Sequence, residues 1–394
     1  MLLNFLRFFS MLLGIVFLAH AFLYFSLVKF FSITTYNSKA ILFYTLFILA
    51  ISFILASLIF RLSDNLLTKL YYFISSIWYG FLVYLILASI LLWFIKIIIT
   101  PFNLQPNFFH LLAITLYSIA FLITVYGIYN AFNPVITRIS VPIKNLPREW
   151  ENKKIIQVSD LHLGPVYGYG FMKKIAGLIE KEDPEIILIT GDLFDGSSAN
   201  HAKFVPALNL LQAKKGVYFA SGNHEIYSGY PKIMPVIQKS SIELIDNKII
   251  NLDGLQIIGL GYPDFYKIDY PKFKLKNNPD FNPKLPSILL FHSPSDIKDV
   301  LENNNTSHNE AYFKPNTKYK TAQELGISLQ LSGHTHAGQI FPFTLLTKQI
   351  FKGFHYGLHK LDGFHIYITS GTGTWGPPVR LGCPSEVVVI TLRK

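Results

Sequence analysis

Five short apolar runs of this chain each end in residue types that bind metal ions in proteins. The first run ends in Asp160 and His162, and the second ends in Asp192. The other three end in Asn223-His224-Glu225, in His292, and in His334-Thr335-His336. Carboxylate, imidazole and amide oxygen ligands suit divalent ions such as Mn, Fe, Zn or Ni. Five such endings in succession predict a metal centre.

The local spacing of these residues supports the same interpretation. Side chains two residues apart emerge on the same face of an extended segment, so Asp160 and His162 can reach one ion. His334 and His336 repeat this spacing, although a tight turn can direct them to neighbouring ions. Glycine precedes three of the groups, at Gly191, Gly222 and Gly333. A glycine permits a sharp turn and a close backbone approach because it has no Cβ atom.

The elements that must position these residues are short runs typical of β-strands. Strands are predicted at 154–158, 185–190, 216–220, 255–259, 287–291, 328–331, 364–369 and 387–392, with helices at 171–181 and 232–239. Alternation of strands and helices predicts an α/β sandwich in which helices cover the sheet faces. In open α/β sheets, ligands bind at the carboxyl ends of the strands, which is where the polar residues stand.

The order Asp-x-His, Gly-Asp, Gly-Asn-His-Glu, His and Gly-His-x-His resembles the calcineurin-like metallophosphoesterase superfamily over about residues 153–394. The segments GHTHAGQIFPF, YGLHK and SGTGTWGPPVRLGCPSEVVVITL resemble its bacterial phosphodiesterase branch around YkuE and YaeI. Ala337 stands where that branch more often has glycine, and the polar stretch 302–320 is interpreted as an inserted loop. The resemblance implies two mixed sheets flanked by helices.

The resemblance also implies a role for each site residue. Asp160, His162, Asp192 and His336 would hold one divalent ion, and Asp192 would bridge to a second ion held by Asn223, His292 and His334. His224 would act near the leaving group, oriented by Glu225, so the implied catalytic residues are His224, Glu225 and Asp192. Two cations about 3.5–4 Å apart clamp a phosphoryl group and lower the pKa of a bridging water, which attacks phosphorus.

This chemistry favours hydrolysis of a phosphodiester or pyrophosphate bond. A lipid-linked substrate is one candidate, and some relatives cleave the pyrophosphate of UDP-diacylglucosamine. The alternatives are a nucleotide or phosphoprotein phosphatase and a non-catalytic binding module. A module is disfavoured because every matched ligand position is filled. The sequence leaves the metal pair and the oligomeric state open.

Several other residues of this half are weaker candidates for the site. Arg380 is interpreted as either a phosphate contact or a fold-stabilising residue. Tyr167 and Tyr169 can line the pocket, but aromatic packing is the commoner role. His201, His355, His359 and His365 lack a ligand pattern, and Cys383 is predicted to pack in the fold.

The N-terminal third has a different composition. Four apolar stretches, at 8–28, 40–60, 70–95 and 108–132, are each long enough to span a bilayer. We therefore predict an integral membrane protein with a membrane region at 1–132, a linker at 133–152 and a hydrolase domain at 153–394. His20 and His110 have no acidic partner within the stretches, so they are interpreted as structural. Membrane lipid is an expected partner.

Charge gives a prediction for the orientation. Four spans place both termini on one side, which would carry Arg7, Arg61, Lys69, Arg138, Lys144 and Arg148, against Lys29, Lys39 and Lys96 on the other. The positive-inside rule then puts the hydrolase domain in the cytoplasm of a bacterium, at its inner membrane. The net charge of +11 is split between both halves without a dense basic run, so nucleic acid is not an expected partner.

Overall fold

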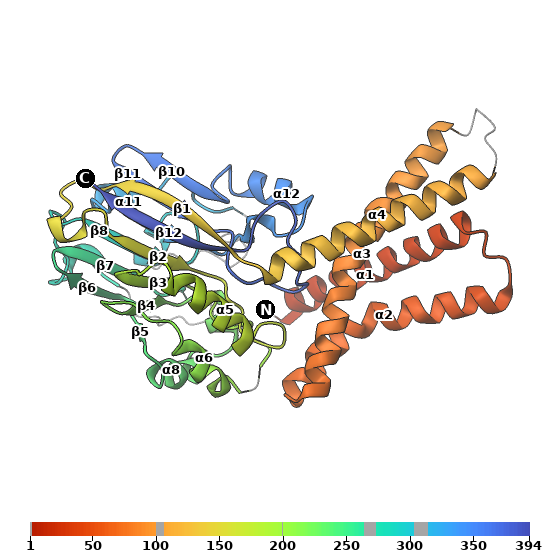
Figure 1. Cartoon of the computed structure of the whole chain (residues 1–394), viewed down its shortest axis with the longest axis horizontal. Coiled ribbons are helices and arrows are strands. Elements are labelled where there is room, and N and C mark those ends of the chain that lie inside the picture. Colours follow the sequence, from red (N-terminus) through yellow and green to blue (C-terminus); the bar gives the residue numbers. More distant parts are fainter. Residues whose placement is uncertain (1, 100–105, 199, 264–272, 303–313) are drawn as a thin grey trace. The chain divides into compact units, whose positions relative to one another are not determined.

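The computed structural model describes residues 2–99, 106–198, 200–263, 273–302 and 314–394 (Figure 1). The chain divides into two compact units. One consists of Met1–Tyr129 with Gly376–Val379, and the other of Asn130–Trp375 with Arg380–Lys394. Of the predicted inserted loop at 302–320, residues 303–313 lie outside the described residues.

The first unit is built from the four predicted apolar helices. They are α1 (Leu2–Phe30), α2 (Tyr36–Leu62), α3 (Leu66–Ile99) and α4 (Pro106–Phe132). Their mean hydropathy lies between 2.1 and 2.7, and each is long enough to cross a membrane. His20 is hydrogen-bonded on both ring nitrogens, to the Val16 carbonyl at 2.8 Å and to the Trp78 indole at 3.0 Å. These bonds match the structural role predicted for His20.

The second unit contains two six-stranded mixed sheets, as predicted from the family resemblance. The first has the order β1-β12-β2-β3-β4-β5. Its strands are β1 (Val135–Pro142), β12 (Glu386–Arg393), β2 (Lys154–Val158), β3 (Ile186–Thr190), β4 (Val217–Ala220) and β5 (Ile242–Leu244). Strand β12 runs parallel to β1 and antiparallel to β2, and β2 to β5 are parallel to one another.

The second sheet has the order β10-β11-β9-β8-β7-β6. Its strands are β10 (Gly357–Leu361), β11 (Phe364–Ile368), β9 (Leu329–Ser332), β8 (Ser287–Phe291), β7 (Leu255–Leu260) and β6 (Lys248–Leu252). The four central strands are parallel, and the two outer strands, β10 and β6, are antiparallel to their neighbours.

Three apolar cores hold these layers together. One core fills the space between the first sheet and helices α5 (Tyr169–Glu180) and α8 (Tyr230–Gln238) (Figure 1). A second lies between the two sheets and includes Leu188 of β3 and Leu290 of β8. The third packs the outer face of the second sheet against α11 (Lys320–Glu324) and neighbouring loops. The two sheets therefore pack face to face, and the carboxyl ends of their parallel strands can meet.

The segment predicted as a linker, 133–152, is instead part of the hydrolase domain. Strand β1 pairs with β12 over eight residues, from Val135 opposite Glu386 onward. Alternate apolar side chains of β1 serve both faces of the sheet: Ile136 packs on the helix-side core, and Val141 lies in the core between the sheets. Because β1 is an edge strand, polar residues alternate with apolar ones along it. The sequence of this segment therefore resembles that of a loop.

Trp150 anchors this N-terminal segment to the rest of the hydrolase domain. Its side chain is buried in the core between the sheets, and its indole nitrogen donates to the Leu252 carbonyl at 2.8 Å. Trp150→Ala is expected to lower the free energy of unfolding of the domain by about 3–5 kcal/mol, because it leaves a large cavity. Trp150→Phe should lose less, and Lys144→Ala, at an exposed site, should be neutral.

The measurement is thermal unfolding of the full chain in detergent, followed at the β-sheet band of the infrared spectrum. A Trp150→Ala variant as stable as the wild type would show that residues 133–152 are dispensable to the domain.

Candidate metal centre

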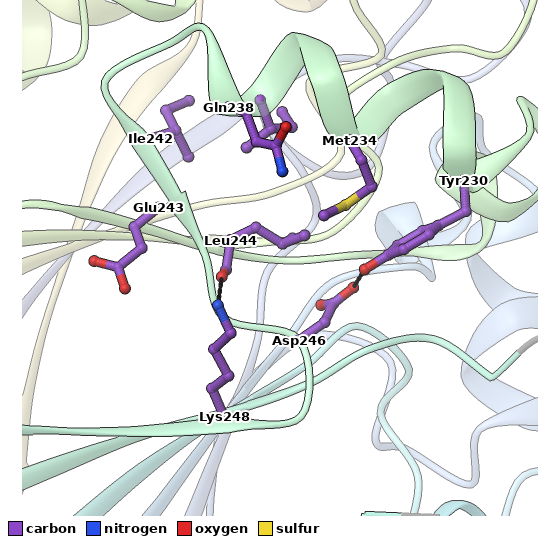
Figure 2. A pocket seen from close by; sticks show the side chains of 9 residues that line it. Tyr230, Met234, Gln238, Ile242, Glu243, Leu244, Asp246 and Lys248 are labelled. Carbon is purple, nitrogen blue, oxygen red and sulfur yellow. Dashed lines mark hydrogen bonds between the residues drawn. The ribbon is translucent and has the colours of Figure 1, made fainter. Parts of the chain in front are cut away.

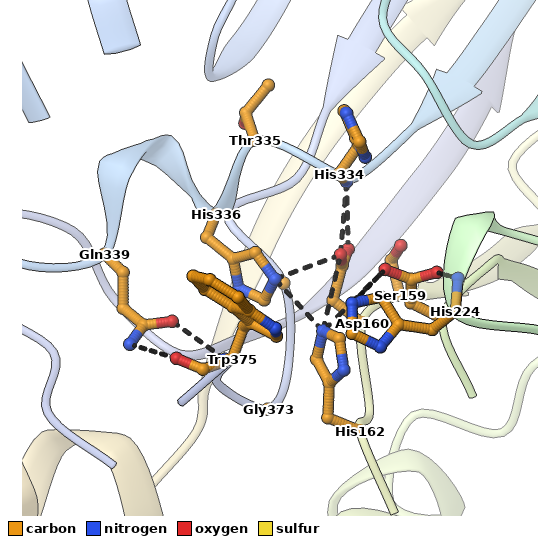
Figure 3. Close-up of polar contacts among 12 residues, drawn as sticks. Ser159, Asp160, His162, His224, His334, Thr335, His336, Gln339, Gly373 and Trp375 are labelled. Atoms are coloured by element: carbon orange, nitrogen blue, oxygen red, sulfur yellow. Dashed lines mark hydrogen bonds and ion pairs between the residues drawn. The ribbon is translucent and has the colours of Figure 1, made fainter. Parts of the chain in front are cut away.

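The first group of predicted ligands comes together at the carboxyl end of β2. His336 Nε2 lies 3.3 Å from Asp160 Oδ1 and 3.1 Å from His162 Nε2. His162 Nε2 lies 3.8 Å from Asp192 Oδ2. All four residues are buried or nearly so, and Figure 3 shows Asp160, His162 and His336 pointing toward one another. Asp160, His162 and His336 form one of the groups able to hold a metal ion.

The second group shares the Asp192 carboxylate. His292 Nε2 lies 3.2 Å from Asp192 Oδ2, the same oxygen that faces the first group. Asn223 Oδ1 lies 3.1 Å from His292 Nε2 and 2.9 Å from His334 Nδ1. Asp192 comes from the first sheet, whereas His292 and His334 follow strands β8 and β9 of the second. The site is therefore assembled from both sheets around one shared oxygen.

The electrostatics of these side chains agree with a site for cations. Burial, followed by the neighbouring His224, holds the pKa of His162 well below its usual value. Burial, followed by the neighbouring His162, does the same to the pKa of His336. Two neutral rings thus face each other through Nε2. Burial disfavours the charged forms of Asp192 and His292, yet their mutual attraction lowers the pKa of Asp192 and raises that of His292 to about 9. A metal cation can replace that proton as the positive charge beside Asp192.

The backbone conformation of the ligands is unusual. Five of them have a positive φ, which side-chain-bearing residues adopt rarely: Asp160 (52°), His162 (47°), Asp192 (52°), His334 (71°) and His336 (49°). Such positions cost about 1–3 kcal/mol each and cluster at functional sites. A Cβ atom at Gly222 would overlap the Asp192 carboxylate, so the close approach predicted for this glycine is observed. The donor set and its geometry fit divalent cations.

Comparison with known proteins agrees with this geometry. Residues 153–338 match the family model described as calcineurin-like phosphoesterase. A metallophosphoesterase of Campylobacter jejuni is 30% identical over 405 aligned positions, which cover 98% of this chain and 98% of that protein. The chain belongs to the calcineurin-like metallophosphoesterases. It is accordingly a metal-dependent phosphoester hydrolase.

Other relatives show similarity over part of their length. The metallophosphoesterase YkuE of Bacillus subtilis is 28% identical over 63% of this chain and 82% of its own length. A Danio rerio protein named as a transmembrane protein with a metallophosphoesterase domain is 28% identical over 69% of this chain and 60% of its own length.

His224 stands at the edge of the metal centre of this metallophosphoesterase. It lies in the first turn of α7 (Asn223–Tyr227), and its ring stacks edge-on against His162 with centroids 4.6 Å apart. Its Nδ1 lies 2.9 Å from the Asp195 carbonyl, and because a carbonyl only accepts, Nδ1 carries a proton. Its Nε2 lies 4.0 Å from Asp192 Oδ2 and faces the cluster. His162, Asp192 and His224 also form a group able to hold an ion.

The expectation that Glu225 orients His224 is wrong. The Glu225 carboxylate is fully buried and accepts four backbone N–H bonds, from Asp192, Leu193, Phe194 and Gly222, at 2.8–3.2 Å. Burial, followed by the Asp192 charge, raises the pKa of Glu225 to about 8. Glu225 therefore ties the Asp192 turn to the Asn223 turn, and the Asp195 carbonyl orients His224. The only sequence signal for Asp195 is its place three residues after Asp192.

Arg380 stabilises the fold behind His336. Its side chain is fully buried and donates to the Gly373 carbonyl at 2.6 Å and to the His336 carbonyl at 3.3 Å. Cys383 Sγ packs against the same His336 carbonyl at 3.3 Å, in the packing role predicted for it. Of the two alternatives for Arg380, the structure favours support of a ligand over contact with substrate.

The remaining candidates lie outside the two groups. Tyr167 is buried and shares a hydrogen bond with Thr374 at 2.9 Å, whereas Tyr169 is exposed. No metal-binding group found among the described residues includes the four other histidines: His201, His355, His359 and His365.

A separate pocket of about 340 Å³ lies beside α8, β5 and β6 (Figure 2). None of the predicted ligands lines it. Its half-buried carboxylate, Asp246, accepts from the Ser221 backbone at 2.8 Å, from the Ser221 hydroxyl and from Tyr230. Asp246 therefore braces the turn that leads to Asn223, and this pocket does not contain the site.

Asp192→Asn is expected to remove most of the bound metal, because both ligand groups share the Asp192 carboxylate and an amide is a weaker ligand. The measurement is metal content by mass spectrometry after purification in Mn²⁺. Asp195→Asn is the matched control, because that half-buried carboxylate bonds to Ser197 and not to the predicted ligands. Two metals at full occupancy in Asp192→Asn would refute the bridging role.

Proposed function

We propose that this metallophosphoesterase hydrolyses a phosphodiester or pyrophosphate bond at a bacterial inner membrane, with a lipid-linked phosphate as its substrate. One observation carries the proposal: two groups of buried ligands converge on a single oxygen of Asp192. Two divalent cations in such a site stabilise charge on a phosphoryl group and lower the pKa of water. Their identity among Mn, Fe, Zn and Ni is open.

The protein's own residues supply positioning and a proton. Asp160, His162 and His336 define one side of the site, and Asn223, His292 and His334 define the other. His224 donates Nδ1–H to the Asp195 carbonyl, so Nε2 is the atom that would hand a proton to the departing oxygen when the ring is in its doubly protonated imidazolium form.

Membrane anchoring supports the lipid-linked substrate. The chain carries four helices long enough to span a bilayer, and a tethered site meets lipid head groups at high effective concentration. UDP-diacylglucosamine is one candidate, because it presents a pyrophosphate at the surface of a bilayer. A soluble nucleotide or a phosphoprotein is the alternative, since a metal pair recognises phosphate and leaves selectivity to the surrounding loops.

The test compares the full-length wild type, loaded with Mn²⁺, with His224→Ala on bis-p-nitrophenyl phosphate, p-nitrophenyl phosphate and UDP-diacylglucosamine. Wild-type protein is expected to cleave the diester and the pyrophosphate. His224→Ala should slow cleavage of the pyrophosphate by about 10²–10⁴-fold and that of the nitrophenyl diester less, because nitrophenolate leaves without a proton.

His359→Ala on β10 is the control and should keep wild-type rates. Metal content separates the two roles open to His224: an equal loss of metal would make it a ligand instead of a proton donor. Absence of turnover on all three substrates in protein that holds two metals would reject the proposed reaction.

We also propose that the hydrolase domain lies in the cytoplasm. Six basic residues flank the spans on the side of the termini, against three on the opposite side. In right-side-out vesicles, external protease should therefore leave the domain intact, and permeabilised vesicles should lose it. Digestion of the domain in sealed vesicles would reverse the orientation.

A further inference from the structure

A group of large apolar side chains is exposed on the hydrolase domain beside the ligand His336. We call it the α12 surface, after helix α12 (Phe343–Ile350). It consists of Phe341 (45% exposed), Phe343 (48%), Leu345 (60%), Leu346 (54%) and Trp375 (62%). Exposed apolar residues are common singly, but several gathered on one segment of a domain point to an interaction site.

Helix α12 is amphipathic without a buried face. Phe343, Leu346 and Ile350 follow one another at intervals of three and four residues, so they share one side of the helix. A helix of a soluble domain normally packs such a stripe against the core. No residue of α12 is buried. Phe343 and Leu346 are therefore exposed and Ile350 is only half-buried in the part of the chain that the structure describes.

Hydrogen bonds tie Phe341 and Trp375 of the α12 surface to neighbouring parts of the hydrolase domain. The Gln339 side chain binds both the carbonyl and the N–H of Trp375, each at 3.0 Å, as Figure 3 shows. The Phe341 N–H donates to the Leu381 carbonyl at 2.9 Å. His336 begins the short 3₁₀ turn His336–Gly338 that leads into this segment. The surface is thus held in a fixed position relative to a predicted metal ligand.

The chain segment that contains α12 carries charges of one sign. Residues 335–361 contain no aspartate or glutamate, and they contain Lys348, Lys352 and Lys360. All three lysines are exposed. Aromatic and leucine side chains bordered by lysines are typical of helices that lie in the interface of an anionic bilayer.

The strand register shows at which end of the first sheet the chain enters the hydrolase domain. Helix α4 ends at Phe132 and β1 begins at Val135, opposite Glu386. The Glu386 N–H bonds to the Gly371 carbonyl, and the next residue, Thr372, bonds to the Ser159 carbonyl, beside Asp160. The chain therefore enters the hydrolase domain at the end of the first sheet that carries the ligands.

We propose that the α12 surface lies in the head-group region of an anionic bilayer and brings the phosphate of a membrane-resident lipid to the metal centre. Phe343, Leu346 and Trp375 would enter the boundary between head groups and acyl chains, while Lys348 and Lys352 bind lipid phosphates. Contact with the bilayer is independent of catalysis, whereas delivery of a lipid substrate rests on the proposed function.

Trp375 provides a direct probe of contact. Full-length protein in nanodiscs of phosphatidylcholine and phosphatidylglycerol is compared with protein in nanodiscs whose acyl chains carry bromine, a short-range quencher of tryptophan. Because the chain has four tryptophans, the signal is the emission of the wild type minus that of Trp375→Phe. This difference should lose about half or more of its intensity in brominated lipid. An unquenched difference would overturn the proposal.

Glutamates on the helix test delivery. Phe343→Glu combined with Leu346→Glu should abolish the quenching of Trp375 and lower the rate on a bilayer-embedded phosphodiester lipid by about tenfold or more. The rate on soluble bis-p-nitrophenyl phosphate and the metal content should stay at wild-type levels. Leu358→Glu, an exposed apolar residue of β10, is the matched control and should change none of these quantities.

The outcomes separate this inference from the proposed function. Equal loss on lipid and soluble substrates would refute delivery. A wild-type protein that cleaves neither substrate would reject the proposed function, and the quenching would still decide bilayer contact. One further outcome would overturn the proposal: Trp375 is not quenched in the wild type, and the double variant differs from the wild type in oligomeric state. The surface would then be assigned to contact with a second copy of the chain.

Discussion

The hydrolase domain depends on the close packing of nitrogen and oxygen donor atoms around Asp192. Two imidazole nitrogens, those of His162 and His336, lie 3.1 Å apart, and a single Asp192 oxygen faces both groups of ligands. Burial removes the water that would otherwise hydrate them, so positive charge must come from protons or from metal cations. A proton on His292 is one such charge, because the neighbouring Asp192 raises the pKa of His292 to about 9. Metal cations would supply the same positive charge and would be bound by all of these donor atoms together.

Such crowding has to be imposed by the surrounding fold. Five ligands sit in left-handed backbone turns directly after buried strands, and these turns bring side chains together that extended chain would separate. Glu225 fixes two of the turns through four backbone N–H groups, and Arg380 holds the back of His336. Since the ligands come from both sheets, the apolar core between the sheets is also part of the metal centre.

The interior strands were predictable from sequence, and the edge strands were not. Runs such as 154–158 and 287–291 are buried on both faces and appear as continuous apolar segments, so their predicted bounds match β2 and β8. The four missed strands, β1, β5, β6 and β10, are the four edges of the two sheets. They alternate between exposed and partly buried residues and blend into loops. Ligand types were readable because they follow interior strands, whereas the Asp195 carbonyl partner of His224 is a backbone atom and leaves no residue signature.

The contrast between interior strands, which carry the predicted ligands, and exposed segments also explains where selectivity for substrate has to arise. A metal centre held by the predicted Asp, His and Asn ligands would recognise phosphate alone, so these positions would serve the reaction and not the rest of the substrate. Residues outside the cores are of a different type from the predicted ligands. They are the exposed aromatic and leucine side chains of α12 and the lysines around them. They follow His336 in the chain and cost the domain little stability to vary, because none of the residues of α12 is buried. Selectivity can therefore change at this surface while the metal centre stays fixed.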